Sequence, residues 1–335
     1  YSLLWEDVGA FINRLGFAYN AIGVYFLGRL WIRQLSDIYH VISTFIFVSI
    51  FVSIFMLLEH MENINYLSLL GGGSGEVIYR AEKIRARGSF AHPITAGTLG
   101  AILLPLFIGM TARKDKMIKA YVGIIAALII TFSSASSGPI IALLAGVTVV
   151  VLWPARKYVR YIIMSSAIII FLLHILMKAP VWALIARAAV IQDSTSYHRY
   201  LLLDQFITRI DEWWLIGTKN HAHWGWMMWD AINQYVAEGI HGGIITLFLF
   251  VCIIYIAMKL AYIFMLQNKY NRIIEYLAWG LYAALFANVI NFFGITYFDQ
   301  IIVIWFTILS IAAAIPEIRK PNITDSELLN SARNS

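Results

Sequence analysis

The chain has 335 residues, of which 60% are hydrophobic and only 13% are charged. A soluble domain carries about twice that charged fraction, so the composition excludes an ordinary soluble protein. The apolar runs reach the ~17–25 residues that cross a bilayer as a helix, whereas a β-barrel shows shorter alternating segments. The net charge of +6 is therefore a signal of membrane topology, and no basic run interleaved with aromatic residues indicates nucleic-acid binding.

Nine apolar segments are predicted to span a membrane as helices, which makes the protein an all-α, polytopic bundle. They cover residues 9–28, 39–58, 93–111, 117–133, 139–153, 160–177, 239–260, 273–293 and 298–316. The first is weak because it holds Arg14, and the fifth is short and opens with Pro139 in its first turn. The chain begins at Tyr1 without a signal-peptide pattern, so we expect further helices to precede it.

The distribution of Lys and Arg predicts how these spans are oriented. One set of alternate loops is basic and carries Arg29, Arg33, Arg113, Lys114, Lys116, Arg156, Lys157, Arg160, Lys259, Lys269, Arg272, Arg319 and Lys320. The short loops on the other side, 134–138 and 294–296, contain neither Lys nor Arg. The basic loops and the tail 317–335 are therefore predicted to be cytoplasmic, which leaves two long segments outside, 59–92 and 178–238.

The first outer segment ends in RAEKIRARGSFAHPITAG (80–97), which places Arg80, Lys83, Arg85 and Arg87 directly before an apolar span. Cations are disfavoured on this side of a membrane, so they are a candidate functional site. Guanidinium groups suit phosphate, and two arginines one residue apart can grip one diphosphate. The alternative is a loop that is translocated regardless of charge, with its cations reaching lipid phosphates. The earlier run GGGSG (71–75) is interpreted as a flexible hinge.

The larger outer segment is rich in tryptophan and contains one predicted helix. Its tryptophans are Trp182, Trp213, Trp214, Trp224, Trp226 and Trp229. Such residues suit a membrane interface, their faces also stack on sugar rings, and an aromatic layer packed under a cap is the alternative. The run SYHRYLLLDQFITRI (196–210) has helical apolar spacing, with Arg199 and Asp204 on its polar side. Arg209 is predicted to pair with Asp211 or Glu212.

The placement of charge separates an enzyme from a transporter. A transporter typically shows charged residues at mid-span, broken helices and internal repeats. The central spans hold no mid-span Asp, Glu, Lys or Arg, and no internal repeat is evident. The polar and charged residues lie in the predicted outer segments instead. This distribution favours an enzyme that acts on an amphiphilic substrate at the membrane surface.

Four ordered segments resemble landmarks of the O-antigen ligase and polymerase superfamily. They are RARGSFAHPITAGTLGAILLPL (85–106), SSASSGPIIALLAG (133–146), YHRYLLLDQFITRIDEWWLIGTKN (197–220) and WDAINQYVAEGIHGGIITLFLF (229–250). The resemblance implies a fold of the membrane glycosyltransferase C type, with a large extracytoplasmic loop between spans six and seven. It also implies transfer of a glycan from a polyprenyl diphosphate carrier, without a metal or cofactor.

The sequence departs from that family pattern at two positions. Ser137 stands where many members carry Arg, and Ile232 stands where ligases carry a His before Asn233. The missing His weakens the lipopolysaccharide ligase interpretation and favours either a polymerase of the exopolysaccharide kind or a ligase-like enzyme with another base. Asp230 lies three residues before Asn233, so both are predicted to share one helix face.

The chemistry requires groups that stabilise the leaving diphosphate and a group that accepts the proton of the attacking hydroxyl. For the diphosphate we expect Arg85, Arg87 and Arg199, supported by Arg80 and Lys83. The alternative for Arg199 is a salt bridge with Asp204.

For the base we expect Asp230 first and His92 second, and we expect Asn233 and Tyr235 to orient the glycan. The alternatives are a helix cap or an Arg partner for Asp230, and a helix start for the His92–Pro93 step. The pair His221-x-His223 lacks further nearby zinc ligands, so no metal is expected.

The predicted protein is a metal-independent, inverting glycosyltransferase of the bacterial inner membrane. It polymerises undecaprenyl-diphosphate-linked oligosaccharide repeat units of exopolysaccharide, capsule or O-antigen on the extracytoplasmic face. The alternatives are an O-antigen ligase acting on lipid A core or another acceptor, and a transporter or flippase of lipid-linked sugars. Expected partners are the lipid-linked glycan and membrane lipids, with a chain-length regulator or another assembly protein as a further candidate, and no nucleic acid.

Overall fold

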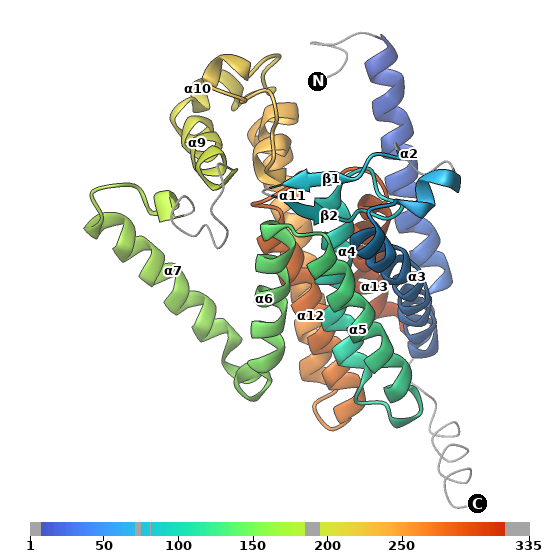
Figure 1. Ribbon diagram of the computed structural model, residues 1–335. Helices are drawn as coiled ribbons and strands as arrows, with labels where there is room; N and C mark the ends of the chain where they lie inside the picture. Colours follow the sequence, from blue (N-terminus) through green and yellow to red (C-terminus); the bar gives the residue numbers. More distant parts are fainter. Residues whose placement is uncertain (1–7, 71–74, 81, 185–194, 319–335) are drawn as a thin grey trace, which may run out of the picture.

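The computed structural model describes residues 8–70, 75–80, 82–184 and 195–318, and nearly all of their regular secondary structure is helical (Figure 1). The predicted all-α class is therefore confirmed. The helices are α2 (Val8–Trp31), α3 (Leu35–Glu62), α4 (Pro93–Met110), α5 (Met117–Ser133), α6 (Ser137–Val151), α7 (Val159–Leu176), α9 (Thr195–Thr208), α10 (Ile210–Trp213), α11 (Gln234–Gln267), α12 (Arg272–Asn291) and α13 (Ile301–Ala314). Short 3-10 helices cover 66–70, 114–116, 153–158, 181–183, 222–224 and 315–317.

Each of the nine segments predicted to span a membrane forms a helix. Within the described residues, six helices are long and apolar enough to cross a bilayer, namely α3, α4, α5, α7, α11 and α12 with their short extensions. The helices α6 and α13 are apolar but shorter. The predicted hinge at 71–75 falls mostly outside the described residues, as does the tail from residue 319 onward.

Helix α4 is the centre of the bundle, where it packs against α3, α5, α6, α12 and α13. Its start is fixed by His92, which caps the helix, and by Pro93 in the first turn. Nearly all of its side chains are buried, so it faces protein on every side. A Cβ at Gly100 would lie 2.3 Å from the carbonyl oxygen of Ala127 in α5. Only glycine therefore allows these two backbones to approach so closely.

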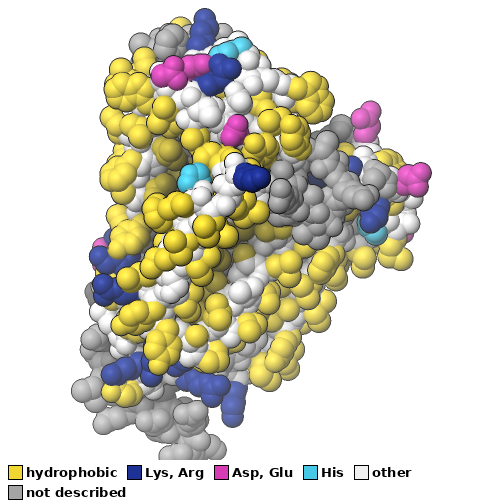
Figure 2. Space-filling view, turned by 90° about the vertical axis from the view of Figure 1, so that its left-hand side faces the viewer, with side chains coloured by type: hydrophobic (Ala, Val, Ile, Leu, Met, Phe, Trp, Pro, Cys, Tyr) yellow, Lys and Arg dark blue, Asp and Glu magenta, His cyan; other side chains and the backbone are white. Residues whose placement is uncertain are grey.

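Helix α7 lies at the periphery of the bundle. It slants away from α6 in Figure 1. Only 6% of the residues in its most apolar stretch are buried inside the protein. An apolar helix with so little protein around it is suited to a lipid environment. Figure 2 shows a broad band of hydrophobic side chains on this side of the molecule, with Lys and Arg gathered at the lower end.

The two ends of the bundle differ in structure (Figure 1). One end, here named the basic end, consists of the short connections 111–116, 152–158 and 268–271. The other, here named the cap end, carries the hairpin of β1 (Ile78–Arg80) and β2 (Lys83–Arg85), together with α9 and α10. The hairpin is antiparallel, with Arg80 opposite Lys83. No sequence pattern predicted this hairpin.

The cap has a small hydrophobic core of its own. It includes Leu202 and Phe206 from α9, Trp213 from α10, and Trp224 and Met228 from the following loop. The rings of Phe206 and Trp213 stack with centroids 3.9 Å apart. Part of the tryptophan-rich segment is thus an aromatic layer packed inside a folded cap, which was one of the three interpretations of these residues.

A break in helix α11 joins the cap to the bundle. At Gly243 the backbone turns to φ 72° and ψ −168°, which interrupts the helix. A Cβ there would lie 2.5 Å from the carbonyl oxygen of Leu215, because the segment after α10 passes directly against the break. The amide of Ile244 donates to the carbonyl of Trp214 at 2.8 Å. This close backbone contact fixes the cap over the start of α11.

Candidate functional site

A cavity of about 480 Å³ opens at the cap end, and five segments that are distant in sequence line it. They are the hairpin, the start of α4, helix α9, the loop 226–232 and the loop 294–298 between α12 and α13. Five of the predicted site residues line this cavity, namely Arg80, Arg85, His92, Arg199 and Asp230. Lys83, Arg87, Asn233 and Tyr235 do not line it.

Arg199 is a buried cation at the cavity wall. Its side chain is 7% exposed, and Nη2 donates to the carbonyl of Gly294 at 3.1 Å. Among the described residues no carboxylate pairs with it, and its buried Nε makes no hydrogen bond. Burial lowers the pKa of Arg199, and the charge of Arg80 lowers it further. The predicted alternative, a surface salt bridge with Asp204, is wrong, because Asp204 instead accepts from the indole of Trp182 at 2.9 Å.

The hairpin places Arg80 and Arg85 at the same cavity. Arg85 is buried, and its Nη2 donates to Oγ of Ser136 at 2.8 Å, directly before α6. A Cβ at Gly138, in the first turn of α6, would lie 3.6 Å from Nη2 of Arg199. The start of α6 therefore lies beside both Arg85 and Arg199. Backbone N–H groups at the start of a helix favour anions. The start of α6 therefore adds to the preference of the two arginines for a negatively charged ligand.

Arg87 and Lys83 lie elsewhere. The guanidinium of Arg87 is buried and donates to the carbonyls of Ala91 at 3.3 Å and Glu76 at 3.2 Å. Its backbone amide donates to the carboxylate of Glu59 at the end of α3, at 3.1 Å. Lys83 is exposed on the hairpin. Arg87 thus connects the end of α3 with the residues before α4, and the structure gives neither residue a place at the cavity.

His92 combines a helix cap with a position at the cavity. Its Nδ1 accepts a hydrogen bond from the amide of Ile94 at 3.1 Å, so the neutral ring carries its hydrogen on Nε2. Burial lowers the pKa of His92 to about 4, with the charges of Arg85, Arg87 and Arg80 acting in the same direction. The imidazole is therefore neutral at physiological pH. It is suited to donate a hydrogen bond to an anion and is a weak proton acceptor.

Asp230 lines the cavity. Among the described residues, its carboxylate has no ion-pair or hydrogen-bond partner. Partial burial raises the pKa of Asp230, and the charge of His198 opposes this effect. The prediction that Asp230 and Asn233 share a helix face is wrong, because α11 begins only at Gln234. Asp230 belongs to the irregular loop before that helix, where its amide donates to the carbonyl of Met227.

Asn233 and Tyr235 have structural contacts. Oδ1 of Asn233 caps α11 by accepting from the amides of Tyr235 at 2.9 Å and Val236 at 3.2 Å. The hydroxyl of Tyr235 donates to the carbonyl of Val289 in α12 at 3.0 Å. Their predicted role in orienting a glycan is therefore not supported by position. A helix-cap signal was present in the sequence, since Asn is a preferred N-cap residue.

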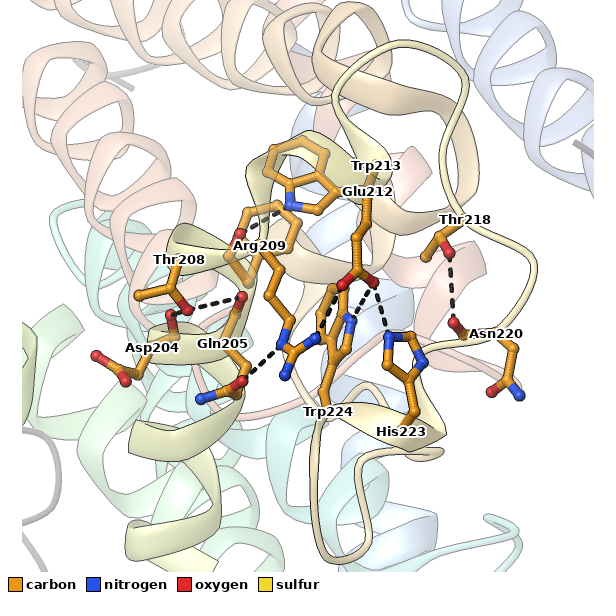
Figure 3. Close-up of polar contacts among 11 residues, drawn as sticks. Asp204, Gln205, Thr208, Arg209, Glu212, Trp213, Thr218, Asn220, His223 and Trp224 are labelled. Carbon is orange, nitrogen blue, oxygen red and sulfur yellow. Dashed lines mark hydrogen bonds and ion pairs between the residues drawn. The ribbon is translucent and has the colours of Figure 1, made fainter.

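Glu212 is the polar centre of the cap (Figure 3). Its carboxylate accepts hydrogen bonds from Arg209 at 2.9 Å, from the indole of Trp224 at 2.8 Å and from Nε2 of His223 at 2.8 Å. The predicted pairing of Arg209 with a neighbouring acid is confirmed. His223 is thus engaged by Glu212, and no cluster of three or more metal-ligating side chains occurs among the described residues.

Two features of the cavity, His198 and the loop 294–298, were not predicted from the sequence. His198 is buried beside Arg199, and its Nε2 donates to the carbonyl of Met227 at 3.0 Å. Trp226 and the loop 294–298 complete the lining. His198 was adjacent to a predicted site residue, but the uncharged loop 294–298 carried no local signal of a site.

Comparison with known proteins does not assign the chain to a family. No protein-family model matches its sequence, and no curated protein is similar to it.

Proposed function

We propose that this protein is a membrane glycosyltransferase that uses a polyprenyl-diphosphate-linked glycan as donor and polymerises its repeat units. One observation carries the proposal: Arg80, Arg85 and Arg199, from two separated outer segments, line one cavity that also holds the carboxylate of Asp230. The four segments that resemble the O-antigen ligase and polymerase superfamily contribute His92, Ser136, Arg199 and Asp230 to the cavity or its wall.

An anion is the ligand that best explains the cationic wall. A buried cation without an opposite charge is costly, and the like charge of Arg80 adds to the cost at Arg199. A diphosphate group would offset both costs, because its oxygens accept the fork of hydrogen bonds that guanidinium groups offer. The amphiphilic surroundings, an apolar helical bundle below and a folded cap above, suit a diphosphate that is attached to a lipid.

The transfer reaction follows from these groups. The hydroxyl oxygen of the acceptor sugar attacks the anomeric carbon of the donor, and the bond from that carbon to the diphosphate oxygen breaks. The electron pair leaves with the diphosphate, where the arginines and the Nε2 hydrogen of His92 stabilise the new charge. The hydroxyl proton passes to the carboxylate of Asp230. A single displacement of this kind inverts the configuration at the anomeric carbon.

The location of the site is part of the proposal. The lysines and arginines of the basic end favour a cytoplasmic position for that end, so the cap and its cavity face the extracytoplasmic side of a bacterial inner membrane. A polymerase is favoured over a ligase because Ile232, at the position where ligases carry His, lines the cavity with an apolar side chain.

Reconstitution tests the proposal. The purified protein in proteoliposomes is supplied with an undecaprenyl-diphosphate-linked oligosaccharide repeat unit, and the products are separated by length. A ladder of products joined through the opposite anomeric configuration supports a polymerase. Transfer that occurs only after lipid A core is added would replace the polymerase with a ligase. Movement of the lipid-linked unit between leaflets without a new glycosidic bond would overturn the enzymatic proposal.

A further inference from the structure

The loop between Trp224 and Asp230 has an unusual distribution of buried and exposed side chains. Trp224 and Met228 are 4% and 1% exposed and belong to the core of the cap, whereas Trp226 and Trp229 are 70% and 66% exposed. The loop is thus anchored at two points four residues apart. A large apolar ring on a well-anchored loop loses little further entropy when a ligand covers it.

The backbone of the same loop is held in conformations that are uncommon for most residues. Gly225 has φ 152° and Met227 has φ 57°, which for methionine is a sparsely populated region. The buried His198 donates to the carbonyl of Met227 at 3.0 Å and so fixes this turn against α9. Strained loop positions persist where the surroundings determine them, and they concentrate at binding sites.

Of the two exposed tryptophans in this loop, only one faces the cavity that the arginines line. Trp226 lines it together with Arg80, Arg85, Arg199 and Asp230, and Trp229 does not. An indole beside three guanidinium groups and a carboxylate is poorly placed for insertion into lipid tails, because the charged groups would be carried toward the hydrocarbon. It is well placed for a ligand with both apolar and polar faces.

We infer that Trp226 forms a sugar-binding subsite next to the diphosphate, on whose indole face a pyranose ring of the lipid-linked glycan stacks. The C–H face of a pyranose is apolar and electropositive and complements the electron-rich face of an aromatic ring. Its hydroxyl groups point outward from the ring edge, where polar groups of the same cavity lining can accept their hydrogen bonds. This inference rests on the proposed function and identifies the part of the substrate that the cap recognises.

The subsite would give the enzyme a means of distinguishing a loaded carrier from the spent one. The arginines contact the diphosphate that both lipids share, whereas Trp226 contacts only the sugar. Loss of the sugar during transfer therefore removes one contact and favours release of the carrier.

Two binding probes test the inference in lipid nanodiscs: undecaprenyl diphosphate, and undecaprenyl diphosphate bearing one hexose. Wild-type protein is expected to bind the hexose-bearing lipid more tightly. Trp226→Ala is expected to weaken that binding about tenfold, while the affinity for the bare carrier changes less than twofold. Trp226→Phe should lie between wild type and Ala, and Trp229→Ala is the matched control that changes neither affinity.

The outcomes separate this inference from the proposed function. Equal affinities of the wild type for the two lipids, or a Trp226→Ala variant that binds both as the wild type does, would overturn the sugar subsite and leave the diphosphate site standing. Equal losses for both lipids in Trp226→Ala and Trp229→Ala would identify a membrane anchor instead and also overturn it. Binding of neither lipid by wild-type protein would remove the proposed function itself.

Discussion

The cap end and the basic end of the bundle contain buried or half-buried arginines with different surroundings. At the basic end, Arg156 pairs with Glu275 at 2.7 Å and its guanidinium lies 3.9 Å from the ring centroid of Trp153. At the cap end, Arg199 is more deeply buried and has a single carbonyl as its hydrogen-bond partner within the described residues. The first arrangement satisfies a charge inside the protein, and the second leaves it available to a ligand.

The same contrast extends to carboxylates. Glu275 is buried and ion-paired, whereas Asp230 lines a cavity and its pKa is raised by burial. Groups that are kept charged and incompletely satisfied usually reduce stability, and proteins retain them where function needs them. The comparison therefore predicts that substitutions at the cap end affect activity more than stability, with the opposite result at the basic end.

The largest effect is expected for Asp230→Asn. The amide keeps the shape of the side chain but cannot accept the proton of the attacking hydroxyl, so turnover should fall by about 10²–10⁴-fold. The melting temperature should stay the same or rise, because a partly buried carboxylate without a hydrogen bond is removed. Initial rates with the lipid-linked repeat unit and thermal unfolding measure the two quantities.

Asp211→Asn is the matched control for that substitution, since Asp211 is an exposed acid in helix α10 of the cap and does not line the cavity. It should retain the wild-type rate. A fully active Asp230→Asn variant would remove Asp230 from the reaction.

A somewhat smaller loss of turnover is expected for Arg199→Met. Removing one group that stabilises the leaving diphosphate should lower turnover by about 10²–10³-fold. Stability should be unchanged or higher, because methionine fills the space without the cost of an uncompensated buried charge. Arg199→Lys keeps the charge but lacks the planar fork, so it should also lose most activity.

Arg156→Met gives the reverse result if the comparison holds. Glu275 would be left buried without its partner, and the free energy of unfolding should fall by up to about 3 kcal/mol. The turnover of the protein that remains folded should be close to that of the wild type. Loss of stability in Arg199→Met together with retained turnover would show that both arginines are structural.

The sequence predicted the helices well because apolar length and caps are local signals. The His92–Pro93 start of α4 and the apolar run after it needed no tertiary information. Arg85 and Arg199 were also predictable as site residues, but the directions of their side chains were not. Arg199 was placed on the polar side of its helix, whereas the structure buries it against the loop that contains Gly294, 95 residues later in the chain.

Local rules also failed to separate Arg85 from Arg87. Alternate residues of a strand point the same way, but strand β2 ends at Arg85, so the rule does not extend to Arg87. Strands of only three residues gave no recognisable hairpin signal. The family resemblance suggested a ligand contact for Asn233, whereas in the structure its side chain caps helix α11.

The smallest effect among the activity predictions concerns pH. Asp230 must be ionised to accept a proton, and its pKa is raised, so activity should fall as pH decreases through a value above the ordinary aspartate pKa of about 3.9. His92, with its pKa lowered to about 4, should add no inflection near pH 6.5. In the His92→Gln variant, activity should therefore fall at the same low pH as in the wild type. If the fall in activity at low pH is absent in the His92→Gln variant, His92 and not Asp230 is the base.

The central claim is that arginines from two separated outer segments bind one diphosphate, and a double-mutant cycle tests it most directly. The affinity for undecaprenyl diphosphate is measured for wild type, Arg80→Met, Arg199→Met and the double variant. Each single substitution should weaken binding by about tenfold or more. The loss in the double variant should be smaller than the product of the single losses, because the two side chains share one ligand. Losses that multiply as independent effects, or a double variant that binds as the wild type does, would contradict the account.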